Sequence, residues 1–256
     1  MSKGASIKFT SYPETVTKLL NLLKLEKELK KYDKVVLKVS LNYSQYPQFE
    51  ETEKSSTEFI ESVLKFVLEN KNPVAEVFIA EGADGPDTNE LFDKHGFRNL
   101  AEKYSVGLVD LNNTETEETY NRNFTKFTSI HYPKILKESF VISLTKLSED
   151  PETDLHGSLS NMLGAFPSKH YSGFFSSKKN KIRKWPIKYS INDIVHCKVP
   201  EFAIIDASDK GYILAGLPLE MDKQSSKLLG MEWKEVPYLR LLNESLQEVE
   251  NAQQIQ

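Results

Sequence analysis

The chain has 256 residues, of which 39 % are hydrophobic and 27 % charged, and its formal net charge is −4. This length fits one large domain or two small lobes, and the composition excludes a disordered or collagen-like chain. The mild negative charge argues against a surface that binds nucleic acid throughout. Because Cys197 is the single cysteine, we exclude an internal disulfide, an all-cysteine zinc site and an iron–sulfur cluster carried by this chain.

The hydropathy pattern also bears on targeting. Residues 1–9 contain no long apolar segment of the signal-peptide type, and no run approaches the ~18 apolar residues of a membrane-spanning helix. We therefore expect a soluble, cytoplasmic protein without a membrane partner.

The N-terminal half alternates short β-branched runs with stretches of helical periodicity. The β-branched runs predict strands at Ser6–Phe9, Val35–Val39, Val74–Ala80 and Val106–Leu111. The periodic stretches predict helices at Tyr12–Lys31, Ser55–Asn70 and Thr88–Tyr104. The polar segments 40–54, 81–87 and 112–123 are expected to be loops.

The C-terminal half alternates less regularly. Its apolar runs predict strands at Phe127–Ile130, Phe140–Leu144, Phe202–Ile205 and Tyr212–Ala215. Helical patterns are found at Lys134–Glu138, His156–Phe166, Ile191–Val195, Pro218–Gly230 and Tyr238–Val249. We expect a loop at Pro151–Asp154 and an irregular, basic segment at Ser168–Lys188.

Alternating strands and helices favour an α/β fold, here with a largely parallel or mixed sheet flanked by helices. We treat residues 1–256 as one such domain. The weaker alternation after residue 124 leaves open a division into lobes 1–124 and 125–256, the second forming a smaller lobe or a mixed edge of the sheet.

Polar residues follow several predicted strands, and ligands of open α/β sheets bind beyond these carboxyl ends. The residues at these positions are Ser40 and Asn42, Glu81, Asp110, Thr145 and Lys146, and Asp206. Strand ends are also polar simply because they leave the core. Where several of them meet at one edge, we expect Asn42, Glu81 and Asp206 to bind a ligand together with Asn161.

The segment 146–175 has the highest density of unusual residues. Gly157 and Ser158 precede a predicted helix, whose free N–H groups and dipole suit an anionic group, and Lys146 would add a positive charge. Ordinary capping by Ser158 explains the same pattern. His156 and His170 are the candidate acid–base residues, because histidine titrates near about pH 6.5. With Lys146 they form the predicted catalytic set.

Other chemistries lack their motifs. His156 and His170 with Glu81 or Asp154 match no compact metal-binding spacing, so we predict no metal site. A G-x-S-x-G element, a P-loop and a G-x-G-x-x-G loop are all absent from the sequence.

A basic cluster with one aromatic residue covers Lys178–Trp185. It would suit nucleic acid, an acidic partner or a flap over an anionic ligand, although we favour a solvated, mobile loop. The cluster is rich in lysine, whereas arginine is the preferred base-reading side chain, so we do not expect a nucleic-acid partner.

Several sequence blocks, in order, resemble the family of domain of unknown function 362. They run from about residue 5 to residue 230 and comprise Val36–Asn42, Ala80–Gly82, Leu108–Leu111, Val141–Leu147, Ser158–Phe166, His170, Asp193, Ile204–Asp206 and Ile213–Asp222. The resemblance implies an α/β fold and no assigned reaction. Some family members carry ferredoxin-like modules, for which this chain lacks the cysteines.

The chain departs from the family pattern at two places. Thr145 stands where the family has proline before Lys146, and the family's glycine-rich loop after Asp206 is shortened to Ala207–Gly211. These departures leave two functional hypotheses open. The first is an enzyme, or enzyme-derived protein, that binds a small anionic molecule, and the second is a non-catalytic binding or scaffold protein that has lost the ligand loop. The cofactor is unknown, and homo-oligomer formation stays open.

Overall fold

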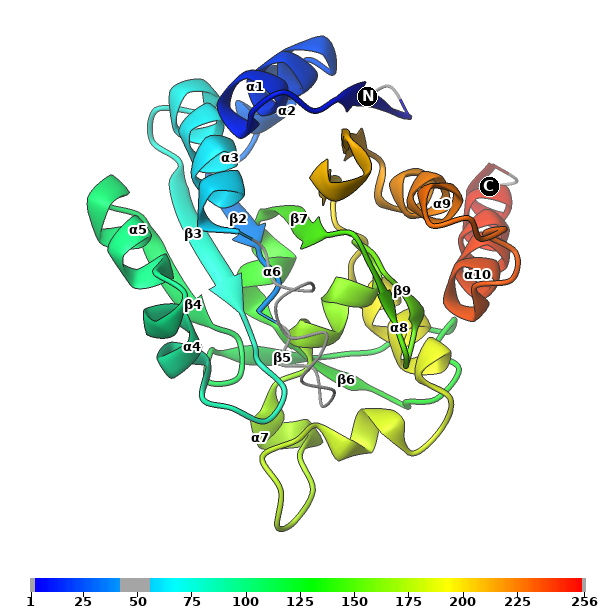
Figure 1. Cartoon of the computed structure of the whole chain (residues 1–256). Coiled ribbons are helices and arrows are strands. Elements are labelled where there is room, and N and C mark those ends of the chain that lie inside the picture. The colour runs from blue at the N-terminus through cyan, green and yellow to red at the C-terminus, as the bar shows by residue number, and fades with distance from the viewer. Residues whose placement is uncertain (1–2, 42–55, 255–256) are drawn as a thin grey trace.

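The computed structural model describes residues 3–41 and 56–254 (Figure 1). Within these residues one large sheet contains β1 (Gly4–Lys8), β2 (Lys34–Lys38), β3 (Glu76–Glu81), β4 (Gly107–Asp110), β7 (Phe140–Lys146), β10 (Phe202–Ala207) and β11 (Tyr212–Gly216). The spatial order is β1-β11-β10-β7-β2-β3-β4. The five strands from β10 to β4 are parallel neighbours, and β11 runs antiparallel to both β10 and β1. The predicted α/β fold with a mixed, largely parallel sheet is confirmed.

Both halves of the chain contribute to this sheet. Strands β2, β3 and β4 precede residue 124, whereas β7, β10 and β11 follow it, and β1 returns to the far edge beside β11. The N-terminal strand therefore lies next to strands from the C-terminal half.

Helices cover both faces of the sheet (Figure 1). One face packs against α1 (Tyr12–Leu22), α2 (Leu25–Leu29), α3 (Thr57–Asn70), α4 (Thr88–Lys94) and α5 (Phe97–Tyr104). The other packs against α6 (Lys134–Glu138), the 3-10 helix η2 (Ser160–Ala165), α8 (Ile187–Cys197), α9 (Pro218–Leu228) and α10 (Pro237–Gln254). Shorter elements are α7 (Ser168–Tyr171), η3 (Asn180–Arg183) and η4 (Ser208–Lys210).

The strands supply alternate residues to the two faces, as a period of two requires. In β2, Val35 and Leu37 join the core beneath α1–α5, and Val36 joins the core beneath η2 and α8. Among the described residues, no helix combines the length and apolarity needed to cross a bilayer.

Two long predicted helices are each broken into two. Lys24 adopts a left-handed conformation (φ 57°) between α1 and α2, and Gly96 does so (φ 74°) between α4 and α5. Glycine adopts this conformation without a Cβ penalty, whereas for lysine it costs about 1–2 kcal/mol. The apolar pattern continues across both breaks, which is why the sequence predicted continuous helices.

Two small antiparallel pairs also differ from the prediction. β5 (Thr116–Thr119) lies in the segment 112–123, which was expected to be a loop, and pairs with β6 (Ile130–Pro133), which shares only Ile130 with the predicted strand Phe127–Ile130. β8 (Ser148–Asp150) pairs with β9 (Asp154–His156), so His156 ends a strand and is not part of the predicted helix His156–Phe166, of which only Ser160–Ala165 is helical, as η2. The Asp150 carboxylate accepts hydrogen bonds from the backbone N–H groups of Glu152 and Thr153, which closes this hairpin.

Ile142 offers a test of the central packing. It is fully buried in β7, opposite Phe202 of β10 and Leu37 of β2. We expect Ile142→Ala to lower the free energy of unfolding by about 2–5 kcal/mol. The shorter side chain leaves a buried cavity in the central strand, which its two parallel neighbours cannot collapse to fill. Urea denaturation measures the loss. The control Val74→Ala, at a residue 76 % exposed, should change it by less than about 0.5 kcal/mol, and equal losses for the two variants would contradict the packing described.

Candidate functional site

A buried ion pair lies at the carboxyl edge of the sheet, where β2 ends with Lys38 and β3 ends with Glu81. The Lys38 Nζ donates to Glu81 Oε2 at 2.9 Å, to Asn161 Oδ1 at 2.8 Å and to the Val39 carbonyl at 3.0 Å. The side chains of Lys38, Glu81 and Asn161 are each at most 2 % exposed. The three N–H bonds of this ammonium group are thus matched by three acceptors of the chain.

Asn161 connects this pair to η2. Its Nδ2 donates to Ser143 Oγ of β7 at 3.0 Å and to the Lys38 carbonyl at 3.2 Å. Glu81 in turn accepts from the backbone N–H groups of Gly82 at 2.7 Å and Leu41 at 3.2 Å. The side chains at the ends of β2 and β3 are therefore held in one orientation.

A second buried lysine, Lys179, approaches from the segment between α7 and η3. Its Nζ donates to the carbonyls of Gly82 at 2.6 Å and Gly164 at 3.1 Å, and the side chain is 1 % exposed. Burial lowers the pKa of Lys179 to about 8 and also lowers the pKa of Lys38, with the charge of Glu81 opposing both shifts.

The margin of this cluster carries further charges. The Lys179 backbone N–H donates to Asp84, and Arg183 pairs with Asp84 at 2.5 Å and with Glu152 at 2.7 Å. We refer to Lys38, Glu81, Asn161 and Lys179 as the lysine cluster. Its buried part contains two ammonium groups and one carboxylate, and the half-buried margin has one guanidinium between two carboxylates.

His156 lies beside the lysine cluster. Its Nε2 is 2.9 Å from Ser40 Oγ, and both side chains are at most 1 % exposed. Burial lowers the pKa of His156, and the charges of Asp150, Lys38 and Glu81 act on it as well. The imidazole is therefore neutral near neutral pH and able to accept a proton.

Thr145, at the end of β7, is also buried, and its Oγ1 has no hydrogen-bond partner among the described residues.

Lys146 and Asp206 lie elsewhere, on the sheet face that packs against α1. Leu144 and Ile204 lie two residues before Lys146 and Asp206 in their strands, so each pair points to the same face, and both Leu144 and Ile204 belong to the core under α1. Asp206 accepts hydrogen bonds from the Tyr12 hydroxyl at 2.8 Å and from the Ser208 N–H at 2.9 Å.

Lys146 pairs with Asp209 at 2.9 Å. Each of the two predicted residues, Lys146 and Asp206, thus has a partner outside the lysine cluster.

The last two predicted site residues are His170, which is not part of the lysine cluster, and Asn42. His170 stacks on His131 with ring centroids 3.9 Å apart, and burial is the largest cause lowering its pKa. Asn42 lies outside the described residues. Of the seven predicted site residues, the structure groups Glu81, Asn161 and His156.

The predicted anion site at Gly157–Ser158 is occupied by the chain itself. One carboxylate oxygen of Asp222, in α9, accepts from the Ser158 N–H at 2.7 Å and the Ser158 hydroxyl at 2.6 Å. The other accepts from the Leu159 N–H at 3.0 Å and the Tyr238 hydroxyl at 3.2 Å. Burial raises the pKa of Asp222 to about 6. The donors that we expected to hold an external anion are therefore used internally.

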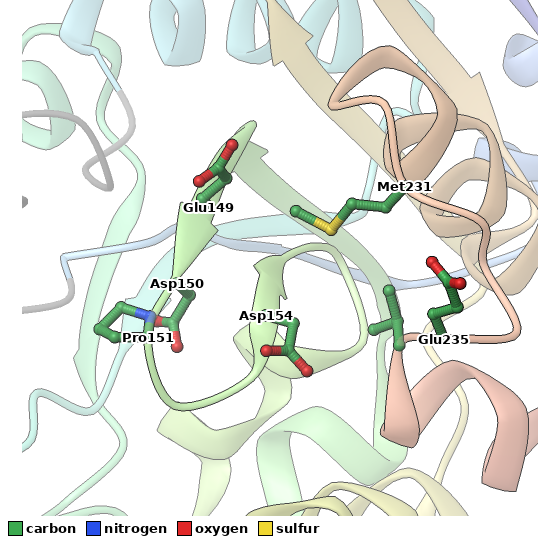
Figure 2. Close-up of a pocket in the computed structure, with 7 residues that line it drawn as sticks. Glu149, Asp150, Pro151, Asp154, Met231 and Glu235 are labelled. Atoms are coloured by element: carbon green, nitrogen blue, oxygen red, sulfur yellow. The ribbon is translucent and has the colours of Figure 1, made fainter.

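A separate pocket of about 470 Å³ lies between the β8–β9 hairpin and the segment before α10 (Figure 2). Its lining comprises Glu149, Asp150, Pro151, Asp154, Met231, Glu235 and Val236. Four carboxylates make this pocket unsuitable for an anion. In the part of the chain that the structure describes, no group of three or more His, Cys, Asp or Glu side chains is arranged to hold a metal ion.

Sequence reasoning overlooked Lys38 and Lys179 as site residues. A signal for Lys38 was present, because a lysine inside the apolar run Val35–Val39 must be buried with a partner if the strand is central. Lys179 was grouped with its exposed neighbours, since nothing in a run of lysines distinguishes the one that turns inward.

Gly164 tests how tightly η2 packs on the lysine cluster. A Cβ at this position would lie 2.7 Å from Lys38 Nζ and closer still to Glu81 Oε1. We expect Gly164→Ala to lower the free energy of unfolding by about 1–3 kcal/mol through overpacking, as measured by chemical denaturation. Gly173→Ala is the control, because its nearest neighbour would be the flexible Asn180 side chain at 3.2 Å. A Gly164→Ala variant as stable as this control would contradict the close packing.

His156 predicts a pH dependence. Its pKa is lower in the folded chain than in the unfolded chain, so the unfolded state binds more protons as the pH falls below about 6.5. Relative to His156→Gln, the wild-type chain should therefore lose free energy of unfolding on acidification through this range. Denaturation across a pH series measures the difference, with the value near about pH 8 as the reference. Parallel curves for the two proteins would show that His156 is not buried in its neutral form.

Comparison with known proteins assigns the chain to a family. A search of curated proteins found no match. The family model described as "Domain of unknown function (DUF362)" matches residues 35–211, which include β3, β7, β10, all of β2 except Lys34, and all four residues of the lysine cluster. Because this match covers more than half of the sequence, the chain belongs to the DUF362 family.

Proposed function

We propose that this chain binds a small anionic molecule at the carboxyl edge of β2 and β3, against the lysine cluster. The observation that supports this most is the pair of ammonium groups, Lys38 and Lys179, buried with a single carboxylate, Glu81. Burying an ammonium group is costly unless it is paired, and among the described residues no carboxylate forms an ion pair with Lys179, which favours an anionic ligand.

The two lysines have different roles in this proposal. Lys38 uses its three N–H bonds on Glu81, Asn161 and Val39, so it is a positioning residue. Lys179 donates to two carbonyls within the described residues, and its third N–H bond is available to a ligand. The location supports the proposal, because ligands of α/β folds bind where parallel strands end.

The catalytic version of this proposal assigns proton transfer to His156. Buried, neutral and 2.9 Å from the Ser40 hydroxyl, His156 has the protonation state of a general base. Lowered pKa values of Lys179 and His156 in one place are typical of functional sites. Lys146, His170 and Asp206 are not included, because their contacts lie outside the lysine cluster.

The alternative is a non-catalytic binding or scaffold protein, and one observation favours it. Lys38, Glu81 and Asn161 satisfy one another and the surrounding backbone, so they stabilise the chain without any ligand. In this alternative the lysine cluster holds η2 and the segment around Lys179 on the sheet.

Ligand-dependent stability separates the two functions. Native mass spectrometry of the purified protein would detect a molecule that copurifies, and thermal unfolding with inorganic phosphate, succinate and citrate would detect added anions. At about 100 times its Kd, a bound anion raises the free energy of unfolding by about 2.7 kcal/mol. We expect Lys179→Met to abolish this stabilisation, because it removes the donor and the charge.

The control is Lys227→Met, which removes an exposed lysine from α9 and should leave ligand stabilisation unchanged. If no molecule copurifies and none of the three anions stabilises the wild-type chain, the scaffold alternative is favoured. Equal stabilisation of the wild type and Lys179→Met would remove Lys179 from the site.

A further inference from the structure

The chain between α7 and α8 includes a loop, which follows α7 and projects from the body of the molecule (Figure 1). Residues 168–188 contain seven basic side chains, one of them the buried Lys179, and no aspartate or glutamate. Its charge therefore contrasts with the net charge of −4 of the whole chain.

Two adjacent phenylalanines form the tip of this loop. Phe174 and Phe175 are each 97 % exposed, the highest values among the large hydrophobic residues described. Their rings contact only edge to face, with centroids 5.0 Å apart and planes at 77°. Trp185, 55 % exposed, lies in the same segment. Phe174 and Phe175 thus place two exposed apolar side chains together, which indicates a surface that a partner covers.

The same segment carries exposed lysines, two of which share a pocket with Phe174. Lys169, Lys178, Lys181 and Lys184 are all exposed. A pocket of about 460 Å³ behind the tip is lined by Ser168, Lys169, Ser172, Gly173, Phe174 and Lys181. Two ammonium groups and two hydroxyl groups in one pocket match the oxygens of a phosphate group.

The base of the loop is firmly attached. On one side, the Tyr171 hydroxyl accepts a hydrogen bond from the His131 N–H, and Lys169 donates to the Thr114 carbonyl. On the other side, Lys179 is buried in the lysine cluster and Arg183 pairs with Asp84 and Glu152. The loop is thus presented from a fixed base, which lowers the entropic cost of docking.

We propose that this loop, residues 171–178, docks on an anionic lipid surface. Phe174 and Phe175 insert at the boundary between the lipid headgroups and the acyl chains, and Lys169 and Lys181 contact lipid phosphates in the pocket behind them. Aromatic insertion and lysine attraction together are the two signals that peripheral membrane binding requires. Our expectation of no membrane partner considered spanning and signal segments alone, and this docking needs neither.

The geometry favours a lipid surface over single-stranded nucleic acid. Bases stack on open, parallel aromatic faces, whereas the edge-to-face arrangement of Phe174 and Phe175 covers part of one ring. Insertion into a lipid surface requires apolar volume only.

Vesicle flotation tests this proposal. Wild-type protein should float with vesicles of phosphatidylcholine and phosphatidylserine in a three-to-one ratio, and flotation should weaken on pure phosphatidylcholine or at high salt. The double variant Phe174→Ser/Phe175→Ser should bind the mixed vesicles at least about tenfold more weakly. Lys169→Glu/Lys181→Glu should also weaken binding to mixed vesicles, because it reverses the charge of the pocket.

The control is Val74→Ser, at an exposed apolar residue far along the chain from the loop, which should float like the wild type. Circular dichroism and thermal unfolding establish that each variant is folded. The proposal is overturned if the wild type does not float with the mixed vesicles, or if the double phenylalanine variant floats equally well. It is also overturned if the loop variants leave flotation unchanged but abolish binding of a fluorescent oligothymidine, because the partner would then be nucleic acid.

Discussion

The buried ammonium group of Lys38 is the constraint on which the arrangement of this molecule's carboxyl edge depends. A charge removed from water at the end of a central strand must be matched by acceptors from its neighbours. Glu81 supplies a carboxylate from β3 and Asn161 supplies an amide oxygen from η2. The same requirement explains Gly164, since any side chain there would collide with both members of the ion pair.

The segment between α7 and α8 combines two environments within a few residues. Lys179 points inward and shares the carboxyl edge with Lys38, whereas Phe174 and Phe175 point outward into solvent. Neighbouring residues of one basic segment therefore serve a candidate ligand site and a candidate lipid-binding surface. A ligand at the lysine cluster and a lipid surface at the loop would both act on the same short segment.

The sheet could be predicted from the sequence because its strands are apolar runs of the length that buried parallel strands require. Strands β2, β3, β7 and β10 lie within a few residues of their predicted positions. The breaks at Lys24 and Gly96 could not be predicted in this way, because a left-handed residue interrupts a helix without interrupting its apolar periodicity. The β8–β9 hairpin was missed because its residues are polar and it is closed by Asp150.

The sequence by itself determined the fold class and the edge of the sheet at which polar residues gather, since both follow from local periodicity and from where apolar runs end. Only the tertiary structure decided which of these residues meet. Glu81 and Asn161 join Lys38, while Lys146 and Asp206 lie on the α1 face with other partners. Sequence-distant pairs such as Lys38–Asn161 and Ser158–Asp222 depend on sheet order and on the packing of η2 and α9, which no local pattern records.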